Sequence, residues 1–451
     1  MTPEKAFWAF FTFVLLVFLM GGGSRYDIDS VGPLRALAAL FLAIGIYYQS
    51  GQSFRQVAAP VVLLVALGLW MVVQLIPLPP SWWTSLHGRE SIARAGELIG
   101  LQDVWRPITF SPLRTFNSLA SLVVPLAALV WLALLDEQGW RRVQSTIIAF
   151  GVLSALLGIA QISLNGAPGL YLYEVTNSGS AVGLFSNRNH NALFLNIALL
   201  FCIFRKREGK AKWKSEDLFI LAGQIALLGA ILINGSRFGI ALLGIVAIIF
   251  AVRVIWVDRA GTAASGSNRR WRQTLVGILA GVAAIILIGF FAALDQIPAV
   301  SRLFDQGVAQ DLRVRSFPDV LHMAIGHFPF GVGFGAFEQA YRTIESEDLL
   351  SPAYFNQAHN DWLQVVVEGG LPGVLLLFVG LLLTIRRVWS AWKSRHESAT
   401  NFQLVMLGLL TLLLIGMHSI VDYPLRVPAM MCVATVALGM VFASRNTVAQ
   451  V

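Results

Sequence analysis

The chain contains little charge for its length. Aspartate, glutamate, lysine and arginine make up 13% of its 451 residues, whereas 56% are hydrophobic. A soluble domain carries about twice that share of charged residues. The sequence therefore excludes an ordinary water-soluble enzyme and indicates that lipid is the solvent for most of the chain.

Signatures of soluble enzymes are also missing. The sequence has no phosphate-binding P-loop and no H-E-x-x-H motif, and its glycine-rich run at 330–337 lacks the flanking strand and helix of a dinucleotide site. The two cysteines, Cys202 and Cys432, lie inside apolar blocks, where they are expected to act as small packing residues. We therefore expect no disulfide, no bound metal and no cofactor, and we interpret residues 330–337 as a tight loop.

The apolar residues are present in blocks that have the length required by a bilayer core. These blocks predict an all-α, polytopic protein of about 12 transmembrane helices, forming a single membrane domain over residues 1–451. The expected spans are 6–22, 34–49, 60–77, 117–135, 145–164, 191–204, 217–233, 238–256, 274–294, 362–385, 403–420 and 427–444. We expect the first block to be kept as a span and not to be cleaved as a signal peptide.

Lysine and arginine predict the orientation of these spans. Three basic segments, 205–216, 252–272 and 386–397, fall on the same side, which the positive-inside rule makes cytoplasmic. Both termini are then cytoplasmic. The net charge of +8 reflects topology and does not indicate nucleic-acid binding. The long loops 78–116 and 295–361 are expected on the periplasmic side, the second as a subdomain between spans 9 and 10.

Arginine occurs where helices are expected to begin on the periplasmic face. Arg188 stands in the run 186–191, and Arg237 ends the run 234–237. A helix N-terminus carries partial positive charge, so an arginine there is unfavourable unless an anion binds, and the combination suits a phosphate or diphosphate. Taken singly, each arginine is equally well explained by contact with lipid phosphate or with a local carboxylate.

Other residues are candidates for the same site. Arg313 and Arg315 in the long loop are expected to close the site from above. The side chains of Arg188, Arg237 and Arg313 are expected to line one cavity. Further candidates for substrate contact are Asn187, Asn189 and His190.

His359 is the candidate for proton chemistry. It precedes an expected helix start, where the neutral imidazole, which is able to accept a proton, is favoured. The alternative is a histidine that only caps the helix or hydrogen-bonds within the loop. Asn360 and Asp361 suit helix caps in either case, and Asn360 is also a candidate for substrate contact.

Asp422 and Arg426 share a short turn near the end of the chain. We expect them to form an ordinary ion pair. A role in orienting an arginine or the acceptor is the alternative.

Several of these motifs match a known family. His359 and Asn360 are followed by nine residues and then by Gly370-Leu371-Pro372-Gly373, which fits an H-[NSQ]-x9-G-x-x-G pattern. Supporting matches are Gly183-x-Phe185-x-Asn187-x-Asn189, Ser236-Arg237 and the glycine run after Pro329. Over roughly residues 180–440 the chain resembles the O-antigen ligase and Wzy-type polymerase superfamily.

The resemblance implies a GT-C-like glycosyltransferase of the bacterial inner membrane. No metal is expected, because guanidinium groups can stabilise the departing charge, and a single displacement would invert the anomeric centre. Its donor would be a glycan on undecaprenyl diphosphate at the periplasmic face. Its acceptor would be a sugar hydroxyl, on lipid A–core for a ligase or on another carrier-linked glycan for a polymerase. His359 would activate the hydroxyl, while Arg237 and Arg313 would stabilise the leaving group. Arg313 is preferred over Arg315 as the loop arginine.

Two other classes of protein remain possible. Twelve spans suit a transporter, although transporters usually contain repeats and place ionisable groups near the membrane midplane. A non-catalytic membrane assembly protein would use His359 only as a cap, so that replacing it with alanine would leave function intact.

Overall fold

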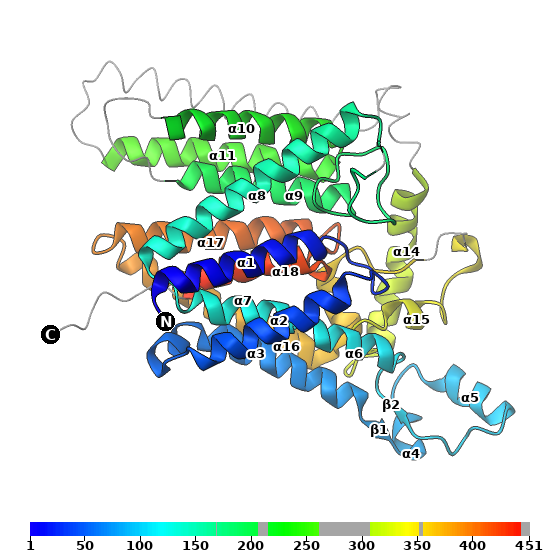
Figure 1. The fold of residues 1–451 in the computed structure, drawn as a ribbon. Helices are drawn as coiled ribbons and strands as arrows, with labels where there is room; N and C mark the ends of the chain where they lie inside the picture. Colours follow the sequence, from blue (N-terminus) through cyan, green and yellow to red (C-terminus); the bar gives the residue numbers. More distant parts are fainter. Residues whose placement is uncertain (168, 206–214, 261–306, 351–354, 443–451) are drawn as a thin grey trace. The chain divides into compact units, whose positions relative to one another are not determined.

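The computed structural model describes residues 1–167, 169–205, 215–260, 307–350 and 355–442, which are mostly helical (Figure 1). The described part also contains a small antiparallel ribbon, in which β1 (Pro77–Leu78) pairs with β2 (Arg106–Pro107). The chain divides into two compact units. Unit 1 comprises Met1–Arg142 and Gln310–Val451, and unit 2 comprises Val143–Ala309.

Unit 1 combines helices from both ends of the chain. In chain order these are α1 (Pro3–Met20), α2 (Val31–Tyr47), α3 (Gly51–Leu75), α4 (Pro80–Trp83), α5 (Glu90–Leu98), α6 (Pro112–Ser121), α7 (Val123–Leu132), α14 (Gly307–Gly326), α15 (Phe337–Tyr341), η2 (Glu347–Leu349), α16 (Asp361–Lys393), α17 (Ala399–His418), η3 (Pro424–Arg426) and α18 (Pro428–Phe442). Helix α7 packs against α1, α2 and α18, while α3 packs against α6 and α16. The almost wholly buried α7 is therefore the centre of this bundle.

Unit 2 is built around α9 (Arg188–Phe204), which packs against α10 (Ser215–Ile233) and α11 (Arg237–Ala260). Helix α8 (Glu137–Ser163) begins in unit 1 and continues in unit 2. Nearly every residue of α9 is buried. A side chain at Gly239 of α11 would overlap Ala192 of α9, so the two helices approach each other closely because position 239 is glycine.

The described helices confirm most of the expected apolar blocks. Seven helical segments are long and apolar enough to cross a membrane, and four shorter apolar helices accompany them. Together they correspond to eleven of the expected spans, so the chain is an all-α, multi-pass membrane protein. The block at 274–294 lies outside the described residues, and the total of twelve crossings stays a prediction.

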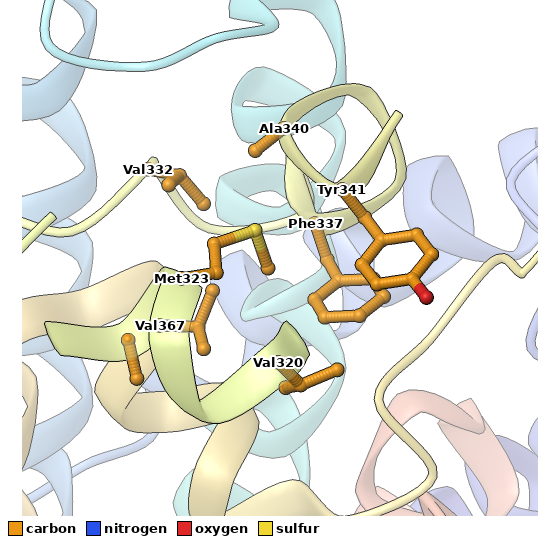
Figure 2. Close-up of a cluster of buried hydrophobic side chains, with 8 residues drawn as sticks. Val320, Met323, Val332, Phe337, Ala340, Tyr341 and Val367 are labelled. Atoms are coloured by element: carbon orange, nitrogen blue, oxygen red, sulfur yellow. The ribbon is translucent and has the colours of Figure 1, made fainter. Parts of the chain in front are cut away.

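The end of the long expected loop is a packed subdomain. Side chains of α14, the 328–336 loop, α15 and α16 converge in one buried cluster (Figure 2), formed by Val320, Met323, Ala324, Val332, Phe337, Ala340, Tyr341 and Val367. The rings of Phe337 and Tyr341 stack one helical turn apart, with centroids 5.6 Å apart. Ala358 and Leu363 pack against this cluster, so it fixes the backbone on both sides of His359.

Candidate functional site

His359 is held at the start of α16 by its backbone as well as by its ring. Its φ of 50° lies in the left-handed region, which a non-glycine residue seldom adopts. Asn360 is the N-cap of α16, because its side chain accepts from the amide of Leu363 at 3.0 Å. The cap expected of Asn360 is thus confirmed, and the tight turn before it orients the imidazole.

The imidazole of His359 faces a buried carboxylate. Nδ1 lies 3.6 Å from Oδ1 of Asp422, and the ring packs against Tyr423 with centroids 4.8 Å apart. The other oxygen of Asp422 lies 4.0 Å from Nε2 of the buried His418. Asp422 therefore stands between two histidines, and its carboxylate favours a proton on the Nδ1 side of His359.

Arg426 does not pair with Asp422, so that expectation was wrong. Its guanidinium donates instead to Oε2 of Glu368 at 2.6 Å and lies 3.8 Å from Oδ1 of Asp361. The short η3 turn directs Arg426 toward α16, whereas the side chain of Asp422 faces His359. Asp422 and Arg426 are therefore close in the sequence but contact different residues, His359 and Glu368 respectively.

The acidic partners of Arg426 belong to one face of α16. Asp361, Gln364 and Glu368 are spaced three and four residues apart, and all are buried. Gln364 donates to Oε1 of Glu368 at 2.9 Å, and Ser419 donates to Oδ2 of Asp361 at 3.1 Å. The sequence contained the signal for this face, since polar residues at helical spacing interrupt an otherwise apolar span.

A kink in α16 separates this polar face from the rest of the helix. Gly370 has a φ of 57° and a ψ of −152°, and Pro372 follows it within the helix. Proline lacks the amide that would bond to the carbonyl of Glu368. That carbonyl accepts instead from the side chain of Gln74 at 2.8 Å and from the amide of Gly333 at 3.1 Å.

The glycine-rich loop forms further backbone hydrogen bonds with α16 on both sides of the kink. The amide of Val332 donates to the carbonyl of Val367 at 2.9 Å, and the amide of Leu371 donates to the carbonyl of Pro329 at 2.7 Å. The expectation of a tight loop at 330–337 is confirmed. The loop acts as a clamp that holds the start of α16, and with it His359 and Glu368, in place.

Gly370→Ala is expected to destabilise the protein by about 3 kcal/mol or more, because an added Cβ would lie 2.2 Å from the carbonyl oxygen of Pro329 at a backbone conformation reserved for glycine. Gly380→Ala on the same helix is the matched control, since its Cβ would meet only Leu63 at 3.6 Å. Thermal unfolding of the purified variants in one detergent measures both. Equal midpoints for the two variants would contradict the role assigned to the kink.

A cavity of about 770 Å³ opens within unit 1 beside this polar face. Its walls are apolar where they are formed by the middle of α3, α16 and α17, for example at Leu64, Leu377 and Leu413. Its polar end includes Gln357, Asp361 and Arg426. Gln357 and Asp361 flank His359 in the chain, so the polar end of the cavity lies next to the turn that carries His359, although His359 is not among the described residues that line it.

In unit 2, the two arginines expected at helix starts occupy those positions. Arg188 is the first residue of α9, and Arg237 is the first residue of α11. The guanidinium of Arg188 reaches the turn before α11, where its Nη1 would lie 3.8 Å from a Cβ added at Gly235. The buried Asn234, which sequence reasoning did not single out, ties the two starts together by donating to the carbonyls of Ala181 and Arg188 at 2.7 and 3.0 Å.

The polar run before α9 supports the start of that helix. The Asn187 side chain caps α9 by accepting from the amide of Asn189 at 2.8 Å. His190 is completely buried in the first turn of α9. Contact of Asn187, Asn189 and His190 with substrate remains a prediction.

The two loop arginines are placed on α14. Arg315 is exposed and donates to the carbonyl of Asp348 at 3.1 Å. The backbone of Arg313 belongs to the same helix, but its side chain lies outside the described part of the structure. The preference for Arg313 over Arg315 therefore stays a prediction.

Within the described residues, histidine, cysteine and carboxylate side chains do not gather in threes as a metal site would require. What the described site offers is a histidine beside a buried carboxylate, a clamped helix start and a cavity with one polar end. Together with the apolar helices, these features define a multi-pass membrane protein with a cavity in one helical bundle.

Comparison with protein families then narrows the class. Residues 222–378 match the family model Wzy_C, described as O-antigen ligase. The chain thus contains an O-antigen ligase family domain, of the kind that performs ligase- or polymerase-type glycan transfer from lipid-linked substrates in membranes. A search of curated proteins finds no match to the chain.

Proposed function

We propose that the chain is an O-antigen ligase-type glycosyltransferase. It moves a glycan from undecaprenyl diphosphate to a sugar hydroxyl of lipid A–core at the periplasmic face of the inner membrane. The cavity of unit 1 carries this proposal, because an apolar chamber with a polar end suits a substrate that joins a long prenyl chain to a glycan. Asp422 beside His359 supports a base in the turn between Gln357 and Asp361, two residues that line that end.

The reaction we propose is one displacement at the anomeric carbon. The acceptor oxygen forms a bond to that carbon while the bond to the diphosphate oxygen breaks, and the anomeric centre inverts. His359 takes the proton of the hydroxyl, and the diphosphate departs with the bonding electrons. Arg237, Arg188 and a loop arginine, for which we propose Arg313, stabilise the departing charge through guanidinium contacts and without a metal.

A Wzy-type polymerase is the second candidate, because the family domain includes both reaction types. The deciding experiment incubates the purified protein with a carrier-linked glycan and either lipid A–core or a second carrier-linked glycan. Transfer to lipid A–core alone supports the ligase, and carrier-linked chains of increasing length support the polymerase. A protein that transfers to neither acceptor would refute the proposed function.

The proposed periplasmic site predicts a topology that cysteine labelling can test. Ser346 is exposed near η2, and Thr400 is exposed in the first turn of α17. A maleimide that cannot cross membranes should label Ser346→Cys in intact spheroplasts but Thr400→Cys only after lysis. The natural cysteines, Cys202 and Cys432, are buried and give a low background. The opposite labelling pattern would place the site on the cytoplasmic side.

A further inference from the structure

Arg35 is an unusual residue for its position. It lies in the first turns of the apolar helix α2 and is half-buried, yet it lines the cavity of unit 1. Its Nη1 donates to Oδ1 of Asn117 on α6 at 2.5 Å. Within the described residues, Nε of Arg35 is buried without a hydrogen-bond partner, and no carboxylate lies at ion-pair distance from this guanidinium.

A buried charge without a counter-charge is costly, and charged residues among membrane helices usually serve a ligand or a partner group. The two carboxylates that line the same cavity, Glu338 and Asp361, face other arginines, Arg114 at 3.3 Å and Arg426 at 3.8 Å. Carboxylates nearby in the chain or on α16 are also paired. Arg25 holds the pKa of the Asp27 carboxyl below its usual range through a direct hydrogen bond. Glu368 pairs with Arg426 at 2.6 Å. The surroundings therefore leave the charge of Arg35 uncompensated.

A second cation reaches the same cavity one helix away. Arg114 precedes Asn117 by three residues on α6, and its guanidinium lies over the ring of Tyr26, 3.1 Å from the centroid. Its ionic partner, Glu338, is 3.3 Å away and is shared with Arg342, which approaches it to 2.6 Å. Arg114 and Arg342 together carry two positive charges, whereas Glu338 carries one negative charge. Positive charge is therefore in excess around Glu338, which lines the cavity.

We propose that Arg35 and Arg114 form an anion-binding site for the phosphate head of a membrane amphiphile. The chain of this ligand lies along the apolar wall formed by Leu63 and Leu67 of α3 and Leu377 of α16. A phosphate suits the site because guanidinium groups bind its oxygens through paired N–H donors. The apolar wall accounts for a lipid in preference to a free anion.

This inference rests on the proposed function, since glycan transfer would use phosphate-bearing lipids. It adds a phosphate contact on α2 and α6 that is separate from the arginines proposed for the leaving diphosphate. Its test is one of binding, so it can fail or succeed independently of turnover. The probe is dodecyl phosphate, added to protein purified in dodecyl maltoside. Inorganic phosphate at the same concentration tests the charge without the chain, and the maltoside itself provides the chain without the charge.

Dodecyl phosphate should raise the thermal unfolding midpoint of the wild-type protein in a saturable manner, whereas inorganic phosphate should not. Arg35→Met should weaken the apparent affinity on the order of 10- to 100-fold, because a charged hydrogen-bond partner is lost. It should also raise the midpoint without ligand, because it removes a half-buried charge that has no counter-charge. If Arg35 had only a structural role, Arg35→Met should instead lower the midpoint and leave the affinity for dodecyl phosphate unchanged.

Arg387→Met is the matched control. Arg387 is also half-buried in an apolar helix of unit 1 and donates to a backbone carbonyl, that of Phe442, at 2.7 Å. Its replacement should leave the affinity for dodecyl phosphate unchanged. Arg35→Lys keeps the charge for the case in which the methionine variant does not fold, and it should bind a few-fold more weakly than wild type. Wild-type affinity in the Arg35 variants, or equal stabilisation by inorganic phosphate, would overturn the site.

Discussion

His359→Gln should lower turnover by about 100- to 10000-fold while leaving donor binding nearly unchanged. Glutamine keeps a polar side chain of similar reach at the start of α16, but it cannot take a proton at neutral pH. The cap of the helix stays with Asn360, so the substitution leaves that support in place. Single-turnover rates and donor affinity, measured separately, separate proton transfer from binding.

His322→Gln is the matched control for this substitution. His322 is exposed on α14 and belongs to the same subdomain, so its replacement should change neither rate nor affinity. Turnover of His359→Gln close to the wild-type rate would mean that the histidine only positions the acceptor or shapes the loop. The proton-transfer role would then be lost, and the role of the arginines would have to be judged on its own variants.

The sequence was sufficient to locate most of the helices, because the length of an apolar block is imposed by the bilayer and does not depend on the fold. It also located His359 and both helix-starting arginines, since the polar runs 186–191 and 234–237 adjoin apolar blocks. Only local information was needed in each case. These features accordingly recur in the structure at the expected residues.

The partner of Arg426 was not accessible in the same way. Glu368 lies 58 residues earlier in the chain, and it faces Arg426 because α16 is kinked at Gly370 and clamped by a loop from residues 328–336. The sequence around Arg426 does not indicate a contact with a residue so far away in the chain. Asp422, four residues before Arg426, was therefore the expected partner. The kink itself was signalled by Gly370 and Pro372, which were interpreted only as part of the motif that follows His359.

Arg35 shows a different limit of the sequence. It stands inside an expected transmembrane block, where a single arginine attracts little notice beside runs of several polar residues. Its importance becomes visible only when Asn117 and Arg114 of another helix, and the cavity that they share, are placed around it. A sequence pattern can reveal polar residues that are close together in the chain. Arg35, Asn117 and Arg114 come together only because two separate helices pack around one cavity.

Arg237→Ala should lower the rate of transfer on the order of 100- to 1000-fold, because one strong electrostatic contact to the departing diphosphate is lost. It should also weaken donor binding, in contrast to His359→Gln. Arg237→Lys keeps the charge but loses the two-pronged geometry that suits phosphate oxygens, so it should retain part of the activity. Rates and donor affinities should be measured for Arg237→Ala, Arg237→Lys and His359→Gln. The comparison separates the effect of the charge at position 237 from the effect of the guanidinium geometry.

The second arginine makes this prediction more specific. Arg188 reaches Gly235, two residues before Arg237, so one diphosphate held by both arginines would couple their effects. The loss in Arg188→Ala/Arg237→Ala should therefore be smaller than the combined single losses. Arg253→Ala is the control on the same helix, since Arg253 donates to the carbonyl of Ile203 at 3.1 Å and packs over Phe204. Strictly additive losses, or an equal loss in Arg253→Ala, would show that the two arginines do not hold one anion.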